Sequence, residues 1–88
     1  MSWKIIISKK ILRNISYFSD SYKQRIIMFL DKLEYDPLPS EHYDIKKLKG
    51  FKDVYRVRFG DYRLIYAIYK EEKIIRILKI TLRKKAYK

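Results

Sequence analysis

Residues 54–68, VYRVRFGDYRLIYAI, constrain the fold of this chain more than any other stretch. Apolar and polar residues alternate on both sides of Gly60-Asp61. This pair suits a two-residue turn of the primed type between antiparallel strands. The sequence therefore predicts a β-hairpin with its turn at Gly60-Asp61.

The simplest register of this hairpin places Arg58 directly opposite Arg63 and puts Arg56 on the same face, because side chains alternate along a strand. Like charges that face each other across strands destabilise a sheet by roughly 0.2–1 kcal/mol, and no carboxylate stands beside them in this register. The three arginines either extend into solvent or are arranged for an anion, and the hairpin alone leaves both interpretations open. The apolar residues predicted on the opposite face are Val57, Phe59, Leu64, Tyr66 and Ile68.

Hydrophobic periodicity and capping residues predict the remaining elements. In chain order they are a strand over Trp3–Ile7, a helix over Lys9–Phe18 capped by Ser8, a helix over Ser21–Tyr35, the hairpin, and a strand over Ile74–Arg83. The predicted core stripes are Ile11, Leu12, Ile15 and Phe18 in the first helix, and Tyr22, Ile26, Phe29, Leu30 and Leu33 in the second. Leu38–Lys47 is predicted to be a polar connection.

The last strand is predicted to place Leu78, Ile80 and Leu82 in the core and Lys79, Thr81 and Arg83 on the arginine side. The fold class is therefore α+β: an N-terminal strand, a two-helix hairpin, then a three-stranded antiparallel sheet with the helices on one face. Residues 1–88 are expected to form a single domain, because 88 residues leave no room for a second core.

Charge and composition narrow the classes of function. The net charge of +12 exceeds the range of about 2–8 that is usual for a small domain, which favours a polyanion or a strongly acidic partner. Cysteine is absent and His42 is the single histidine, so no cofactor or metal site is expected, and His42 is predicted to lie exposed in a loop. The N-terminal apolar run is too short for a signal or a membrane span, so we expect a soluble cytoplasmic protein without membrane contact.

The usual catalytic sets are missing, since no serine or cysteine nucleophile is arranged with a histidine. The candidates that remain are Arg56, Arg58, Arg63, Lys79 and Arg83, with Tyr87 nearby. Arginine forks match phosphate geometry, and several around one phosphate would stabilise a pentavalent transition state. RNA carries its own nucleophile, the 2′-hydroxyl, so such a site needs little more than a base. Tyr87 could act as that base or stack on a nucleobase, and its alternative interpretation is an exposed aromatic residue of the tail.

Three segments carry a resemblance to a known family: LKG at 48–50, YRVRFGDYRLIY at 55–66 and ILKITLRKKAY at 77–87. They resemble the RelE/ParE toxin superfamily, and the archaeal RelE branch most. The resemblance implies a ribosome-dependent endoribonuclease that is independent of metal and cuts messenger RNA in the decoding site by 2′-hydroxyl attack. It implies catalytic roles for Arg56, Arg58, Arg63, Arg83 and Tyr87. Basic residues expected to bind RNA around them are Lys47, Lys49, Lys79, Lys84 and Lys85.

The resemblance also implies partners: a RelB-like antitoxin, a 70S-type ribosome with its messenger RNA, and operator DNA contacted through the antitoxin. In bacterial relatives the second-strand pair is lysine, whereas this chain has Arg56 and Arg58, which are poor general bases because of their high pKa. Some relatives carry a histidine where this chain has Leu82, so the mechanism here leans on Tyr87 and the ribosome. Two alternatives stay open, a ParE-like toxin aimed at DNA gyrase and a non-catalytic basic module that binds RNA or a partner protein.

Overall fold

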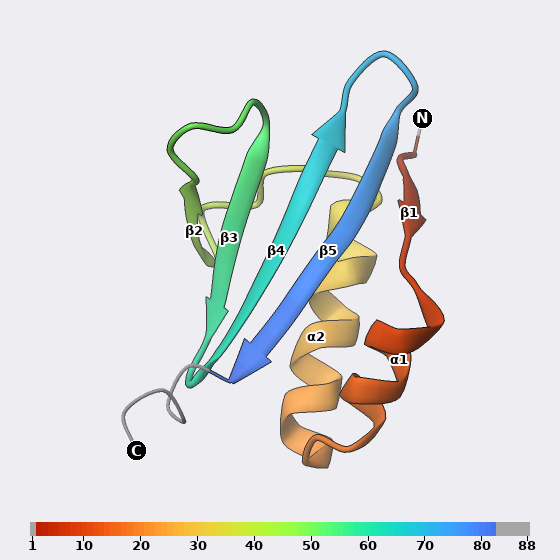
Figure 1. Ribbon diagram of the computed structural model, residues 1–88, viewed down its shortest axis with the longest axis vertical. Coiled ribbons are helices and arrows are strands. Elements are labelled where there is room, and N and C mark those ends of the chain that lie inside the picture. Colours follow the sequence, from red (N-terminus) through yellow and green to blue (C-terminus); the bar gives the residue numbers. More distant parts are fainter. Residues whose placement is uncertain (1, 83–88) are drawn as a thin grey trace.

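A computed structural model of the chain describes residues 2–82 and forms one five-stranded sheet with two helices. The elements are β1 (Lys4–Ile6), α1 (Lys9–Ser16), α2 (Asp20–Leu33), β2 (Asp44–Lys47), β3 (Val54–Phe59), β4 (Tyr62–Tyr69) and β5 (Ile74–Leu82) (Figure 1). The strand order is β1-β5-β4-β3-β2; β1 runs parallel to β5, and the other neighbours are antiparallel. This is the α+β class that the sequence predicts.

The central hairpin has the predicted register. Arg58 pairs with Arg63 and Val57 pairs with Leu64 across β3 and β4. The five apolar residues predicted for the inner face are all at most 5% exposed. Gly60 has a positive φ of 57°, which a turn of the primed type requires and glycine accepts readily.

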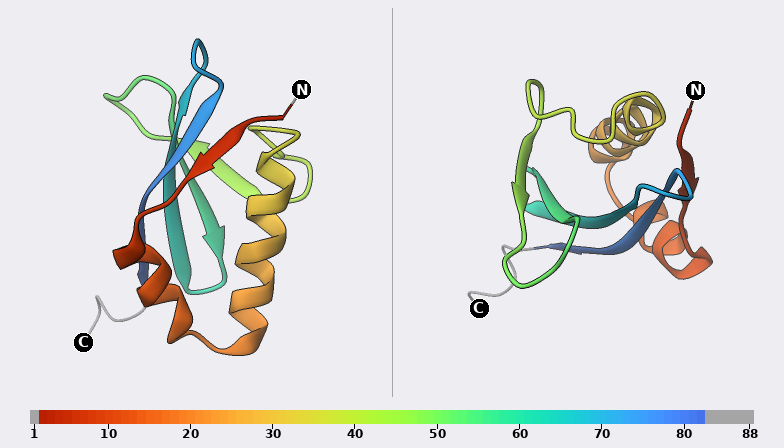
Figure 2. Two further views of the ribbon diagram at one scale, coloured as in Figure 1. Left: turned by 90° about the vertical axis from the view of Figure 1, so that its right-hand side faces the viewer. Right: turned by 90° about the horizontal axis from the view of Figure 1, so that it is seen from above.

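Both helices begin at serine caps. The Ser8 hydroxyl accepts a hydrogen bond from the Ile11 amide at 3.2 Å, as predicted, and Ser19 caps α2 in the same way at 3.4 Å. Figure 2 shows α2 lying along one side of the sheet, while α1 lies near the β1 edge. No helix within residues 2–82 is long and apolar enough to cross a membrane.

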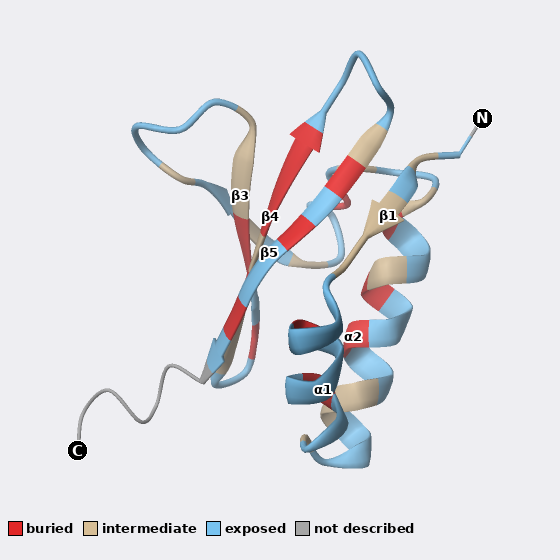
Figure 3. Ribbon diagram, turned by 45° about the vertical axis from the view of Figure 1, so that its right-hand side comes forward, coloured by how far each residue is buried: buried red, intermediate tan, exposed pale blue. Residues whose placement is uncertain are grey.

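The core forms between α2 and the sheet. Phe29 of α2 is fully buried, and its ring meets those of Tyr43, Phe59 and Tyr66 edge-on at centroid distances of 4.9, 5.4 and 5.7 Å. Edge-on aromatic pairs of this kind contribute about 0.5–1.5 kcal/mol each beyond the area they bury. Figure 3 shows the buried positions gathered where the helices and the strands meet. The helix-covered face of the sheet therefore forms part of the core, and the reverse face is available for binding.

Strand β2 corrects the prediction for Leu38–Lys47, which was expected to be a polar connection throughout. Residues Asp44–Lys47 form an edge strand that pairs antiparallel with β3. The sequence DIKK did not reveal it, because an edge strand of four residues needs little apolar surface, and Ile45, its one apolar residue, lies beside Val57. The antiparallel part of the sheet thus has four strands instead of three.

A register shift corrects the prediction for the last strand. Tyr66 pairs with Ile77 but Ile65 pairs with Lys79, which leaves Leu78 as the extra residue of a bulge. Leu78 is 42% exposed, whereas Ile77 is buried at 3%. Ile80 is buried as predicted. Strict alternation cannot anticipate a bulge, because one extra residue exchanges the faces on its N-terminal side.

Element ends and one helix position also differ from the prediction. The first helix ends at Ser16 instead of Phe18, and the second runs from Asp20 to Leu33 instead of from Ser21 to Tyr35. Leu12 was assigned to the core and is 49% exposed, because α1 buries only a narrow stripe at Ile11 and Ile15. The N-terminal strand is shorter than predicted and pairs parallel with β5.

We expect Gly60→Ala to destabilise the protein more than Gly50→Ala. Both glycines have a positive φ, which disfavours alanine by about 1–2 kcal/mol. A Cβ atom at Gly60 would in addition collide with the Tyr22 hydroxyl, whose ring packs edge-on against Tyr62 at 4.6 Å, whereas a Cβ at Gly50 meets nothing within 4 Å. Urea unfolding of both variants measures the difference, and equal losses would contradict this account of the turn.

Candidate nucleic-acid interface

Two rows of side chains cross the sheet face turned away from α2. Residues paired across strands point to the same face, so the register defines each row. The first row is Asp44, Arg58, Arg63 and Thr81, and the second is Lys46, Arg56, Ile65 and Lys79. We call these eight residues the arginine face. They carry five cationic side chains and one carboxylate, so the face attracts anions.

Arg58 and Arg63 stand opposite each other in the middle of the first row. Arg58 is exposed, and Arg63 is half-buried, with its Nε buried and without a hydrogen-bond partner among residues 2–82. Two facing guanidiniums destabilise the sheet unless an anion lies between or above them. A bound phosphate would accept hydrogen bonds from both and relieve that repulsion.

Arg56 is the most buried charged residue of the face, at 7% exposure. Its Nη1 is buried without a partner in the described part of the chain, and its Nη2 lies 3.8 Å from Oδ1 of Asp44. The expectation of a face without a carboxylate was therefore wrong, because the unforeseen strand β2 brings Asp44 beside the arginines. The contact is longer than a hydrogen bond and Asp44 is half-exposed, so this pair contributes at most about 1 kcal/mol.

The structure brings only part of the predicted RNA-binding set together. Lys79 lies on the arginine face, opposite Ile65. Lys47 pairs with Tyr55 and so lies on the reverse side of β2, and Lys49 lies in the loop that follows. The remaining candidates, Arg83, Lys84, Lys85 and Tyr87, fall outside the described residues.

Two residues of the face were missed by sequence reasoning, Lys46 and Asp44. Alternation could have found both, because an inward Ile45 turns its two neighbours outward. The signal was hidden because the segment was interpreted as a loop. Asp44 matters most, since it is the carboxylate that competes with an anion for Arg56.

Tyr66 adds no base to the arginine face, whereas His42 lines a pocket together with Asp44 and Arg58 of that face. The Tyr66 hydroxyl donates a hydrogen bond to the Pro37 carbonyl at 2.9 Å, and burial, with Tyr55 and Asp36 nearby, raises the pKa of Tyr66 above its usual range. His42 is exposed in the connection before β2, as predicted. Within residues 2–82, no three histidine, aspartate or glutamate side chains are grouped so as to hold a metal ion.

Alanine substitutions at Arg56 and Arg58 should separate an effect on stability from an effect on RNA binding. Arg56→Ala is expected to destabilise the protein by about 1–3 kcal/mol, because it removes a buried stem, whereas Arg58→Ala is expected to stay within about 0.5 kcal/mol. Arg58→Ala should instead weaken RNA binding, because that guanidinium is exposed. Thermal unfolding and RNA titration of both variants measure this, and a loss of stability confined to Arg58→Ala would contradict it.

The fold and the arginine face define the class of this protein. It is a small basic α+β domain whose sheet face away from the helices is cationic and suited to binding a polyanion. The family model of the ParE toxin of type II toxin–antitoxin systems matches residues 6–87. The chain is 36% identical over 88 residues to a protein of Methanocaldococcus jannaschii that bears the name RelE1, covering all of this chain and 98% of that protein. The chain therefore belongs to the ParE/RelE family of type II toxins.

Solved structures agree with this assignment. RelE in the RelE–RelB complex of Pyrococcus horikoshii has a TM-score of 0.84 and 38% identity, over 94% of this chain and 97% of that chain. The intact RelBE complex of Escherichia coli gives a TM-score of 0.73 over 90% of this chain and 94% of the matched one. At 16% identity, the second match speaks for the fold alone. The predicted RelE-like fold is thus confirmed.

Proposed function

We propose that this protein is the toxin of a type II toxin–antitoxin pair and that it cuts messenger RNA on the ribosome. The observation that carries the proposal is the Arg58–Arg63 pair, two opposed guanidiniums at the centre of the arginine face. In the proposed reaction the 2′-oxygen of the RNA attacks the adjacent phosphorus. The bond from phosphorus to the 5′-oxygen breaks, which leaves a 2′,3′-cyclic phosphate, and the departing oxygen takes up a proton to become a 5′-hydroxyl.

The roles of the arginines in this reaction follow from their burial. Arg58 and Arg63 are accessible enough to contact the phosphate and neutralise the charge that develops in the transition state. Arg56 is a positioning residue in this proposal, since it is buried and shares its charge with Asp44. Lys46 and Lys79 guide the strand along the second row through charge alone.

Proton transfer is assigned to Tyr87, with Arg83 beside the phosphate, on the family resemblance. Arginine is a poor base, and Tyr66 is engaged with Pro37, so neither supplies a strong base. The ribosome is therefore expected to orient the 2′-hydroxyl, and naked RNA should be cut poorly. Efficient cleavage of free RNA would count against this dependence.

The partner in the cell is proposed to be a RelB-like antitoxin. The P. horikoshii and E. coli neighbours are both RelE structures in complex with RelB. A net charge of +12 is complementary to an acidic segment, and such a segment laid over the arginine face would block access of RNA. Contacts with operator DNA would come through the antitoxin.

A ParE-like activity against DNA gyrase is the second candidate, favoured by the name of the matching family model. Cell-free translation separates the two. The first proposal predicts shortened message detected by primer extension, with gyrase supercoiling intact, and loss of at least ten-fold in cut intensity for Arg83→Ala and Tyr87→Phe. Intact message together with inhibited supercoiling would establish the second candidate. A module that only binds would leave message and gyrase untouched, and its binding would survive Arg83→Ala with a smaller salt dependence.

A further inference from the structure

The loop between β2 and β3, residues 48–53, is fixed at both ends by backbone hydrogen bonds. The Leu48 amide donates to the Val54 carbonyl at 2.9 Å, and the Asp53 carbonyl accepts from the Ile68 amide at 2.9 Å. Gly50 and Asp53 both have positive φ, at 83° and 58°, so the loop turns sharply at two points. A side chain at its tip is therefore presented in a defined place.

This loop extends from the sheet on the side away from α2, as the right-hand view of Figure 2 shows. The arginine face lies on the same side, because its residues point away from the helix-covered core. Arg58 is four residues beyond Val54 along β3, roughly 13 Å at the usual rise of a strand. One extended ligand could therefore contact both the loop and the arginines.

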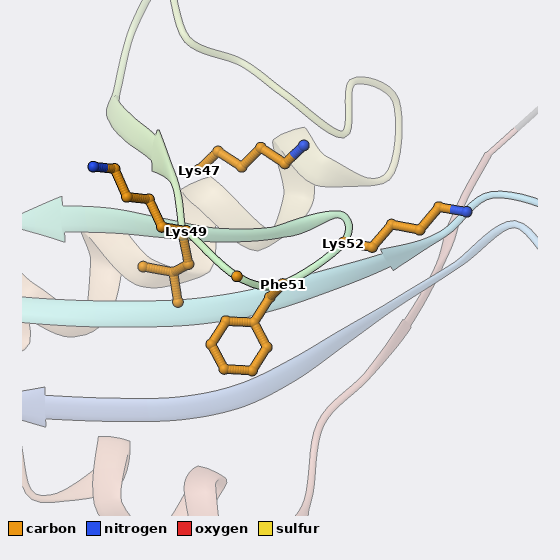
Figure 4. Close-up of a pocket in the computed structure, with 6 residues that line it drawn as sticks. Lys47, Lys49, Phe51 and Lys52 are labelled. Carbon is orange, nitrogen blue, oxygen red and sulfur yellow. The ribbon is translucent and has the colours of Figure 1, made fainter.

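Phe51 is the exposed member of the four phenylalanines, at 62% exposure, whereas Phe29 and Phe59 are buried and Phe18 is half-buried. Residues 47–52 line a pocket of about 510 Å³, and Figure 4 shows the ring of Phe51 turned to one side of the loop, while the side chains of nearby lysines extend in other directions. Lys49 and Lys52 belong to the loop, whereas Lys47 ends β2 and lies on its reverse side. The loop's carboxylate, Asp53, lies 3.7 Å from Nζ of Lys70, so its charge is offset.

An exposed aromatic ring among cations is the arrangement that binds single-stranded nucleic acid, because every nucleobase has a face that stacks and a phosphate beside it. We infer that Phe51 stacks on a base of the RNA strand that lies across the arginine face, while Lys49 and Lys52 of the same loop contact its phosphates. This inference rests on the proposed function and deepens it. It assigns to the β2–β3 loop the task of fixing the strand's position.

The test measures binding separately from cleavage. The probe is a short, fluorescently labelled single-stranded RNA with 2′-O-methyl groups, which cannot be cut, titrated with the full-length protein at low salt. Phe51→Ala is expected to weaken binding on the order of ten-fold and Phe51→Trp to restore it. The matched control is Tyr17→Ala, which should leave binding unchanged, because Tyr17 is an aromatic residue that is 80% exposed at the C-terminal end of α1 and not in the β2–β3 loop.

Salt dependence distinguishes stacking from charge. Lys49→Ala should reduce the slope of log affinity against log salt by about 0.7, and Phe51→Ala should leave it unchanged. Unchanged affinity in Phe51→Ala would overturn the inference, even if the wild type cuts message. The inference would also be overturned if binding of the RNA by the wild type is undetectable, or if Phe51→Ala weakens binding of an acidic peptide but not of the RNA. Weakened RNA binding without any message cleavage by the wild type would support the inference and refute the proposed function.

Discussion

Arg63→Ala is expected to lower message cleavage on ribosomes by ten-fold or more while the protein stays folded. Arg63 lies opposite Arg58 on the arginine face, and its Nε has no partner in the described part of the chain. Removing it leaves the developing phosphate charge with one guanidinium fewer. A ten-fold loss corresponds to about 1.4 kcal/mol of barrier, which is within the reach of one charge-assisted contact. Primer extension on translated message gives the cut intensity.

Arg13→Ala is the matched control for Arg63→Ala, because Arg13 is an exposed arginine on α1, away from the sheet's arginine face. It removes the same charge and should change cleavage little. Thermal unfolding of both variants verifies that neither has lost its fold. Equal cleavage by the wild type and Arg63→Ala would contradict the prediction. An equal loss in Arg63→Ala and Arg13→Ala would also contradict it, because Arg63 would then act only through its share of the overall positive charge.

Phe29→Ala is expected to cost the largest share of stability, about 3–5 kcal/mol. The side chain is fully buried and meets three aromatic rings, so its removal leaves a cavity and breaks three edge-on pairs. A domain of this size has a total stability of about 5–15 kcal/mol, so a large fraction would be lost. The melting temperature should fall by more than about 10 °C.

Tyr35→Ala is the control for Phe29→Ala, because Tyr35 follows α2 and is 76% exposed. Its melting temperature should stay close to that of the wild type. A small change in Phe29→Ala would mean that the ring cluster closes around the cavity, and it would contradict the expected share of Phe29 in the stability of the core.

The hairpin could be predicted from sequence because three local signals agree there. Alternation gives the two faces, Gly60-Asp61 gives the turn, and together they fix the register of β3 against β4. The serine cap at Ser8 was found for the same reason, since the capping hydroxyl lies next to the helix it begins. Interactions between residues close together in the sequence are enough to specify these elements.

Strand β2 and the bulge at Leu78 were not predicted, because the alternation around Ile45 is the one local signal of β2 and the bulge leaves none. A short edge strand is defined by its neighbour β3, and its sequence DIKK is equally compatible with a loop. The bulge is defined by pairing with β4, and it moves Leu78 outward against the alternation. Both features depend on contacts between residues far apart in the chain.

The candidate site also contains residues that the sequence placed correctly and residues that it did not. Arg58, Arg63 and Lys79 were placed together from alternation alone, and the register agrees. Burial distinguishes Arg56 from its neighbours, and that depends on packing that a sequence does not display. Asp44 joined the face only through the unforeseen edge strand.

The end chemistry of the cut message tests most directly whether the arginine face promotes attack by the 2′-hydroxyl. Message translated in a cell-free system with the protein should yield upstream fragments ending in a 2′,3′-cyclic phosphate and downstream fragments beginning with a 5′-hydroxyl, and only when ribosomes are present. Arg63→Ala should yield the same ends at one tenth of the amount or less. Uncut message, or fragments with 3′-hydroxyl and 5′-phosphate ends, would contradict the account.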